Sequence, residues 1–399
     1  MADPAGAGPA AISTVFRSGC DGYASFRIPA VVQQAGELLV FAEGRRGGPA
    51  DSGRIDLVLR RSGDGGQTWT PLAVVCSGGD HTVGNPVPIA VPDSSRIVLL
   101  LTRNDGAATE ADILAGRAPA RSAYVTVSAD AGHSWSTPAE LGSKARDDGW
   151  RWYATGPGHG IVLRHGPHAG RLLAPANHSR APERAGQAGT DPALYGGHGL
   201  VSDDGGRSWR IGYRDDQGDA AVNANETAVA QLPDGQVYVN ARNQQGTAVG
   251  HRAHAWSRDG GEHLTAPMLP VPADQLTVPQ VQASLLCPEP PAGGRPIPPL
   301  LFSGPDHPDQ RRGMAVRASR DGGHTWSVLA RVTSAPAGYS DLVDLGWPLV
   351  GLAFETGTTA PHQRIDFARV RLVTPAPTPR GRREERAAVP APSAAACPR

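Results

Sequence analysis

Short apolar runs recur along this chain, and each is bounded by glycine, proline, aspartate or asparagine. Such runs are typical of β-strands separated by turns, and no stretch has the 3.6-residue spacing of an amphipathic helix. The runs come in groups of four, the first of which occupies residues 27–33, 37–44, 55–62 and 70–75. The same order returns four more times, and a sixth group at 339–373 has only three runs. The pattern therefore predicts a series of four-stranded antiparallel sheets.

Each of the first five groups carries one copy of a polar motif, Ser-x-Asp-x-Gly-x-Ser/Thr-Trp, after its third run. Four copies are complete and the copy at 257–264 is degraded; the five aspartates are Asp64, Asp130, Asp204, Asp259 and Asp321. The aspartate can accept backbone N–H bonds within a turn, the glycine permits a positive φ, and the tryptophan covers the hairpin base. We interpret the motif as a folding device and not as a ligand site. Its recurrence about every 55 to 75 residues lies in or just above the range typical of propellers and arrays.

These features predict an all-β fold, a six-bladed β-propeller of four-stranded antiparallel blades that spans residues 11–373. The outer strand missing from the sixth group is expected to come from residues 12–19, which would close the ring and leave only short, protected edges. Residues 1–10 are expected to be a flexible N-terminus, and the Pro-, Ala- and Arg-rich residues 374–399 a disordered tail. Two insertions are expected to be surface loops, near 105–122 and 178–197.

The 399-residue chain has 38 basic and 38 acidic side chains, which argues against a nucleic-acid or membrane partner held by bulk charge. No apolar run is long enough to span a bilayer. The four cysteines lack the close spacings of zinc ribbons and redox motifs, so we expect free thiols. The N-terminus lacks the basic start and apolar stretch of a secretory signal, which favours a cytoplasmic protein, or a secreted one if a leader has been removed.

The predicted topology sorts polar residues between the two faces of the propeller. The start of a first strand and the loop between the second and third strands lie at one end of a blade, opposite the repeated motif. Positions at that end hold three arginines, three carboxylates and one phenol, namely Arg27, Arg242, Arg317, Asp51, Glu226, Glu355 and Tyr339. Each has an ordinary structural interpretation, such as an Arg27–Glu355 ion pair or a core aromatic at Tyr339. Three guanidinium groups at one mouth favour a ligand carboxylate or phosphate.

The chain resembles the sialidases (neuraminidases) of bacteria and animals. The resemblance runs from about residue 15 to 373. It is carried by Phe-Arg-Ile-Pro at 26–29, by the repeated motif (the family's Asp box), by Asn-Glu-Thr at 225–227, and by the later arginines and tyrosine. It implies a six-bladed propeller with exo-α-sialidase activity, a glycoside hydrolase that releases terminal sialic acid.

The resemblance also implies a role for individual residues. Asp51, Glu226 and Tyr339 are implied to be catalytic, as the acid/base, the partnering carboxylate and the nucleophile. The implied substrate-binding residues are an arginine triad for the sialic acid carboxylate, the acid that orients its first member, and two supporting residues: Arg27, Arg242, Arg317, Glu355, Arg45 and Asp105. Asp105 is a candidate for contacts to the substrate's hydroxyls or amide.

The implied reaction proceeds with retention through a glycosyl-tyrosine intermediate and needs no metal or cofactor. Asp51 must donate a proton near neutral pH, so we expect its pKa to be raised through partial burial once substrate closes the site. The expected partners are sialylated oligosaccharides, glycoproteins or gangliosides, and the protein is expected to be a monomer. Two alternatives remain open at this point: a propeller that binds sialylated glycans without cleaving them, and a structural or protein-binding propeller. Transfer of sialic acid in place of hydrolysis is a variant that the sequence does not decide.

Overall fold

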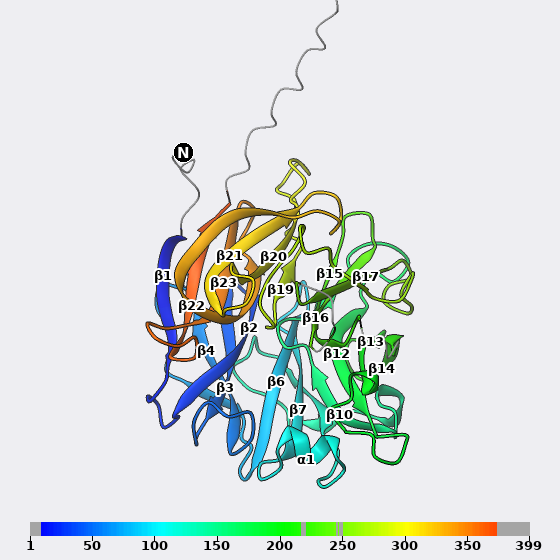
Figure 1. The fold of residues 1–399 in the computed structure, drawn as a ribbon. Coiled ribbons are helices and arrows are strands. Elements are labelled where there is room, and N and C mark those ends of the chain that lie inside the picture. The colour runs from blue at the N-terminus through cyan, green and yellow to red at the C-terminus, as the bar shows by residue number, and fades with distance from the viewer. Residues whose placement is uncertain (1–8, 217–220, 245, 247–249, 373–399) are drawn as a thin grey trace, which may run out of the picture.

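The strands of this computed structural model follow one another around a centre (Figure 1). The structure describes residues 9–216, 221–244, 246 and 250–372, so the expected tail 374–399 lies outside the described residues. Of the N-terminus 1–10 that was expected to be flexible, residues 1–8 also lie outside them, whereas residues 9 and 10 begin a strand. In Figure 1 the colour runs once around the molecule, from blue on the left through cyan at the bottom and green on the right to orange at the top left.

Six groups of strands can be distinguished within four hydrogen-bonded sheets. The first two groups share one sheet and comprise β2 (Ser25–Gln34), β3 (Glu37–Arg45), β4 (Ile55–Ser62) and β5 (Ala73–Cys76), then β6 (His81–Ala90), β7 (Ile97–Asp105), β8 (Ser122–Ser128) and β9 (Ala139–Glu140). The third group comprises β10 (Trp150–Thr155), β11 (Ile161–Val162), β12 (Leu172–Arg180), β13 (Tyr195–Ser202) and β14 (Arg210–Asp215). The fourth comprises β15 (Ala224–Gln231), β16 (Val237–Asn243), β17 (Arg252–Ser257) and β18 (Leu269–Pro270). The last two share the long strand β22 and comprise β19 (Ser284–Leu286), β20 (Leu300–Pro305), β21 (Arg312–Ser319), β22 (Ser327–Asp344), β23 (Leu349–Thr356), β24 (Arg364–Arg371) and β1 (Pro9–Arg17).

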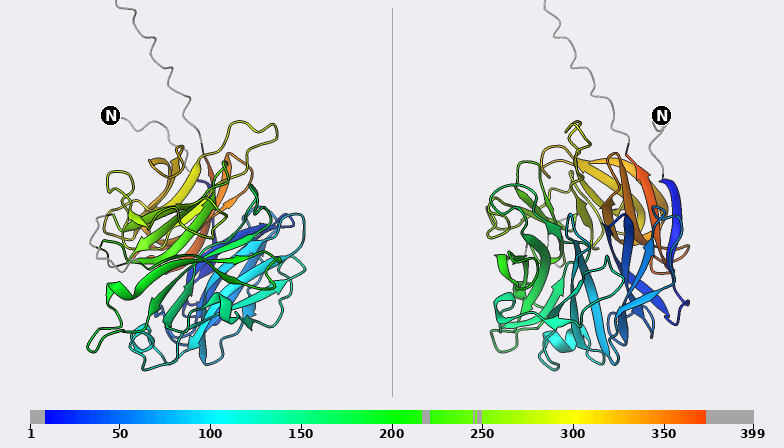
Figure 2. Two further views of the ribbon diagram at one scale, coloured as in Figure 1. Left: turned by 90° about the vertical axis from the view of Figure 1, so that its right-hand side faces the viewer. Right: turned by 180° about the vertical axis from the view of Figure 1, so that it is seen from behind.

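The inner strands of these groups form a closed ring. Each contacts the inner strand of the next group, in the order β2, β6, β11, β15, β19 and β22, and β22 contacts β2 again. The N-terminal strand β1 pairs antiparallel with β24, which confirms the predicted closure by residues 12–19. Figure 2 shows these two ends of the chain side by side, blue against orange, in its right-hand view. The arrangement is that of a β-propeller and is compatible with six blades.

The core is distributed between neighbouring groups. Six clusters of buried apolar side chains each join residues of two adjacent groups. At the ring closure Phe16 of β1 stacks on Phe26 of β2 with ring centroids 5.0 Å apart, and Phe367 of β24 joins the same cluster. Burying such a side chain contributes about 1.5–3 kcal/mol, so the terminal strand is held by apolar burial as well as by its hydrogen bonds.

The Asp-box turns have the predicted hydrogen bonds. In the first, Ser62 Oγ donates to Asp64 Oδ1 (2.7 Å) and the N–H of Thr68 donates to the same oxygen (3.0 Å). Gly66 has a φ of 87°, and a Cβ at this position would lie 2.4 Å from the ring of Phe367 in the adjacent blade. The motif therefore closes a hairpin and packs it against the neighbouring sheet.

Helical structure is confined to three short segments of the described chain, α1 (Glu110–Leu114), η1 (Ser143–Ala145) and η2 (Pro192–Leu194). The first insertion is thus not a simple loop: it holds α1, whose N-terminus has a capping box between Thr109 and Asp112. The second insertion holds η2. Within the described residues, none of the helices has the length and apolar character that crossing a membrane requires.

A buried histidine pair in the third group makes stability depend on pH. His178 Nδ1 lies 3.0 Å from His198 Nδ1, and His178 Nε2 lies 2.7 Å from Asp216. Burial lowers the pKa of both imidazoles, and burial also lowers the pKa of His254 to about 4. The folded state therefore binds fewer protons than the unfolded chain below about pH 6.5. Stability present at pH 7 should be lost as pH falls toward 5.

Urea unfolding followed by tryptophan fluorescence measures this effect. We expect a smaller free energy of unfolding at pH 5 than at pH 7. His159 has the opposite effect on the pH dependence of stability, because the charge of Asp341 outweighs burial and raises the pKa of His159. It is one group, whereas three histidines have a lowered pKa. A free energy of unfolding that is equal or larger at pH 5 would contradict the prediction.

Candidate active site

Glu355 organises one side of the site. Its carboxylate is fully buried at the end of β23 and accepts from Arg27 Nε (3.1 Å) and Nη2 (3.3 Å). It also accepts from the backbone N–H groups of Ile28 (2.9 Å) and Tyr339 (3.2 Å). Ile28 has a φ of 61° beside a bulge in β2, and this unusual backbone is stabilised by its bond to Glu355. One carboxylate therefore fixes the start of β2 and the position of Tyr339.

The residue before Tyr339 has to be small. A Cβ on Gly338 would lie 2.4 Å from Glu355 Oε2. Glycine thus allows the carboxylate to reach Arg27 and the Tyr339 backbone together.

Asp51 lies above two guanidinium groups. Its Oδ1 is 2.7 Å from Arg45 Nη1 and 3.4 Å from Arg27 Nη1, while its side chain stays 73% exposed. Arg45 is itself buried and pairs with Glu43 (2.6 Å). Partial desolvation of Asp51 raises its pKa, but the charges of Arg45 and Arg27 lower it by more, so the pKa lies below the usual value. Two cations therefore stabilise the carboxylate in the unliganded site, and the raised pKa expected once substrate closes the site stays a prediction.

Tyr339 and Glu226 form the centre of the site. The hydroxyl of Tyr339 donates to Glu226 Oε1 in a short hydrogen bond. Arg242 Nη1 donates to Glu226 Oε2 (2.8 Å) and lies 3.4 Å from the Tyr339 hydroxyl. Burial, and then the charge of Glu226, raise the pKa of Tyr339 despite the nearby guanidinium groups. The resting side chain is therefore a neutral phenol beside a hydrogen-bond acceptor.

A third arginine at this centre is Arg311, which the sequence reasoning missed. Its Cζ lies 5.6 Å from the centroid of the Tyr339 ring, and the Cζ of Arg27 lies 5.1 Å from the same centroid. Arg311 precedes β21, in the loop between the second and third strands of its blade. This loop position could have identified Arg311 as a site residue, because the predicted topology places loops between second and third strands at the face that holds the site. Arg27, Arg242 and Arg311 thus surround one phenol.

The structure corrects the placement of Arg317. Its Nη2 donates to Asp306 Oδ1 (2.6 Å), and Nη1 and Nη2 approach the carbonyls of Gly304 and Pro305. Arg317 was predicted to begin a third strand, but β21 begins at Arg312, so Arg317 lies near the Asp-box end of that strand. Its guanidinium is committed to a structural ion pair.

The role implied for Asp105 in contacts to the substrate stays a prediction. The residue is exposed at the end of β7, and its Oδ1 accepts from the N–H of Ala107 (2.9 Å) in its own turn. Glu110 of α1 instead faces the site: partial desolvation and the charges of Asp51 and Glu226 raise its pKa. Thr109 and Asp112, with capping-box spacing, were the sequence signal for the helix that carries it.

The seven residues Arg27, Asp51, Glu226, Arg242, Arg311, Tyr339 and Glu355 are called the mouth below. They hold three cations, three carboxylates and a phenol, a set suited to binding an anion and transferring protons beside it.

Comparison with known proteins gives a consistent result. The BNR repeat-like domain family matches residues 36–351. A sialidase of Micromonospora viridifaciens is 32% identical over 88% of this chain and 53% of its own length. Sialidase-3 of Bos taurus is 31% identical over 86% of this chain and 88% of its own length. The solved structure of the Hadza microbial sialidase Hz136 superposes with a TM-score of 0.74, at 25% identity over 90% of this chain and 68% of that one. The chain spans about half the length of the first two curated relatives it matches.

Proposed function

The chain belongs to the sialidase family, and from that premise and the geometry of its mouth we propose that it is an exo-α-sialidase that hydrolyses terminal sialic acid with retention. The observation that carries the proposal is the hydrogen bond from the Tyr339 hydroxyl to Glu226, with Arg27, Arg242 and Arg311 around the same phenol. The substrates proposed are sialylated oligosaccharides, glycoproteins or gangliosides.

Sialic acid carries a carboxylate on the carbon that is attacked. The three guanidinium groups would hold this carboxylate through charge-assisted hydrogen bonds and so orient the sugar ring. An anionic nucleophile would be repelled by that carboxylate, whereas a phenol arrives neutral. Sialidases accordingly depart from the usual pair of catalytic carboxylates.

In the first step the oxygen of Tyr339 bonds to the anomeric carbon and passes its proton to Glu226. The bond from that carbon to the leaving oxygen breaks, and Asp51 supplies the proton that the leaving oxygen takes. In the second step Asp51, now ionised, takes a proton from water, and the hydroxide attacks the anomeric carbon. The Tyr339 oxygen leaves and recovers its proton from Glu226. Two inversions give net retention.

The substrate would adjust the acidity of Asp51. In the free site the charges of Arg27 and Arg45 hold the Asp51 pKa low. A bound carboxylate offsets part of that positive charge, which favours the protonated acid needed for the first step.

Replacing Arg45 tests this account of Asp51. Arg45→Gln removes the cation nearest to Asp51, so the Asp51 pKa should rise and the basic limb of kcat/KM should move to higher pH. Arg45→Lys keeps a charge and should keep the limb near that of wild type. Arg46→Gln is the matched control, because Arg46 pairs with Asp56 (2.7 Å) and not with Asp51. A limb that stays in place in Arg45→Gln, or moves equally in Arg46→Gln, would contradict the assignment.

A fluorogenic α-sialoside tests the proposed function itself. The wild-type protein should release the fluorophore between pH 4 and 8, and proton NMR should show the α-anomer of sialic acid as the first product. The same fluorophore on a neutral sugar should not be released, because it offers no carboxylate to the arginines. Absence of release from the sialoside by folded protein would favour the glycan-binding alternative.

A further inference from the structure

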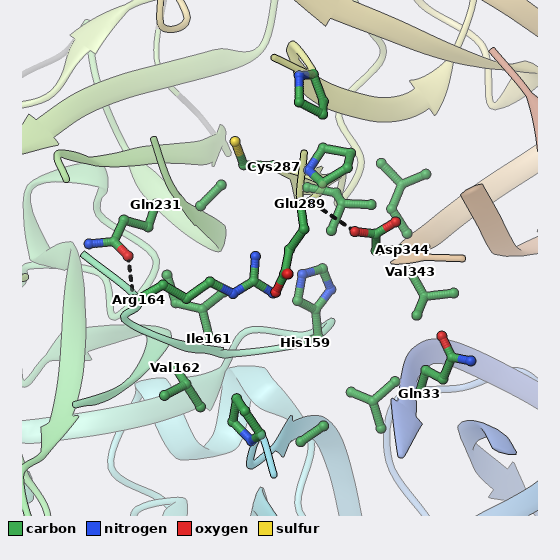
Figure 3. Close-up of a pocket in the computed structure, with 18 of the residues that line it drawn as sticks. Gln33, His159, Ile161, Val162, Arg164, Gln231, Cys287, Glu289, Val343 and Asp344 are labelled. Atoms are coloured by element: carbon green, nitrogen blue, oxygen red, sulfur yellow. Dashed lines mark hydrogen bonds and ion pairs between the residues drawn. The ribbon is translucent and has the colours of Figure 1, made fainter. Parts of the chain in front are cut away.

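A large cavity among the described residues lies away from the mouth. It has a volume of about 1470 Å³ and is lined by the turns that follow the inner strands, such as Ala35 after β2 and Pro233 after β15. Arg27 and Glu226 stand at the opposite ends of these same strands. The cavity, called the far-face cavity below, therefore opens on the face opposite the mouth. Figure 3 shows His159 among its lining residues, near the ion pair of Arg164 and Glu289 (3.0 Å).

A buried carboxylate connects this cavity to the strand that carries Tyr339. Asp341 is 1% exposed and lies two residues after Tyr339 in β22. His159 Nδ1 lies 2.8 Å from Asp341 Oδ1, and the side chain of His159 is 11% exposed at the cavity.

Asp341 accepts two further hydrogen bonds from other parts of the ring. The N–H of Val31 in β2 donates to Oδ2 (2.8 Å), and Ser284 Oγ in β19 donates to Oδ1 (2.7 Å). Val31 lies four residues after Arg27 on the same strand. One side chain therefore connects the strand of the proposed nucleophile, the strand of the first arginine, β19, and the segment before β11.

The residue between Tyr339 and Asp341 is held in a similar way. The N–H of Ser340 donates to Gln282 Oε1 (3.1 Å), and Gln282 Nε2 donates to the carbonyl of Pro157 (3.1 Å). Val281, the neighbour of Gln282, packs with Ile28 and Tyr339 in a small buried cluster. Behind Tyr339, Asp341 and Gln282 thus form a polar network, and His159 connects this network to the far-face cavity.

We propose that Asp341 and His159 are positioning residues. Through the hydrogen bonds that Asp341 accepts, they hold the Tyr339 hydroxyl in the place among the arginines that the reaction requires. The inference rests on the proposed function. Neither residue hydrogen-bonds to the side chain of Arg27 or Glu355, so their replacement should affect nucleophile placement more than substrate binding. A misplacement of a reacting atom by about 1 Å can cost on the order of 100-fold in rate.

Kinetics of four variants test this. Asp341→Asn loses the charge that accepts three hydrogen bonds, and His159→Leu removes one donor; both should lower kcat about 10- to 100-fold with KM nearly unchanged. His159→Gln can still donate to Asp341 and should recover part of the lost kcat. The matched control is His178→Leu, which breaks a comparable buried histidine–aspartate pair outside the mouth and should lower Tm without lowering kcat. Wild-type kcat in folded Asp341→Asn and His159→Leu, or an equal fall of kcat in His178→Leu, would overturn the proposal.

Hydrogen exchange separates this inference from the proposed function. The amides of residues 339–342 should exchange faster in His159→Leu than in wild type, whether or not the protein cleaves sialosides. Unchanged exchange there would overturn the positioning role. If the wild type is inactive but exchange is faster in His159→Leu, the result would support the His159–Asp341 contact as a positioning element and would count against the sialidase proposal alone.

Discussion

Replacing Tyr339 with phenylalanine is expected to lower kcat at least about 1000-fold, because loss of the proposed nucleophile would remove the bond-forming step itself. The ring would still pack with Ile28 and Val281 and lie beneath Arg27 and Arg311. The fold and KM should therefore change little. Steady-state kinetics on a fluorogenic sialoside, with circular dichroism and Tm on the same samples, measure the effect.

Tyr213→Phe is the matched control for this substitution. The Tyr213 hydroxyl is also buried, but it has no hydrogen-bond partner among the described residues, and its ring lies in the cluster between the third and fourth groups. Removing that hydroxyl should leave kcat unchanged and should not lower Tm. A Tyr339→Phe enzyme that retains a tenth or more of wild-type kcat, an increase of no more than about 1.4 kcal/mol in the activation barrier, would show that another group performs the attack.

Arg311→Met is expected to raise KM about 100-fold, whereas Arg317→Met should leave KM near that of wild type. A charge-assisted hydrogen bond contributes about 1.5–3 kcal/mol, and Arg311 lies over the Tyr339 ring where the substrate carboxylate is proposed to bind. Arg317 instead donates to Asp306, so its loss should leave the Asp306 carboxylate without this partner and lower Tm.

The two variants control each other, since each removes one guanidinium from the same blade. KM for the sialoside and Tm are measured on both. The account would be contradicted if Arg317→Met raised KM strongly while Arg311→Met did not, because the sequence-based triad would then be the correct one.

The architecture could be predicted from the sequence because the Asp-box turns and the strand runs are local signals. The serine, aspartate and glycine of each motif make their hydrogen bonds within a few residues, so the pattern alone reports the hairpin. Closure by the N-terminal strand could also be predicted, because the sixth group lacked one partner and only one strand-like run was unassigned.

The site was predicted less completely, because its contacts depend on where strands begin. Arg317 was assigned to the mouth as the start of a third strand, but that strand begins five residues earlier, and Arg311 in the preceding loop occupies the place. The pKa of Asp51 could not be inferred either, since its direction depends on distances to Arg45 and Arg27 that arise only after folding. The axial network of Asp341 joins residues more than 300 positions apart and leaves no sequence pattern.

Covalent trapping tests the central claim most directly. A sialic acid with fluorine at C2 and C3 should label the protein, because the C2 fluoride leaves readily while the C3 fluorine slows hydrolysis of the intermediate. Peptide mapping by mass spectrometry should then find the fluorosialyl group on Tyr339, formed as the oxygen–C2 bond replaces the C2–fluorine bond, and no label on Tyr339→Phe. A label on Glu226, Asp51 or any other residue of the wild-type protein would contradict the account.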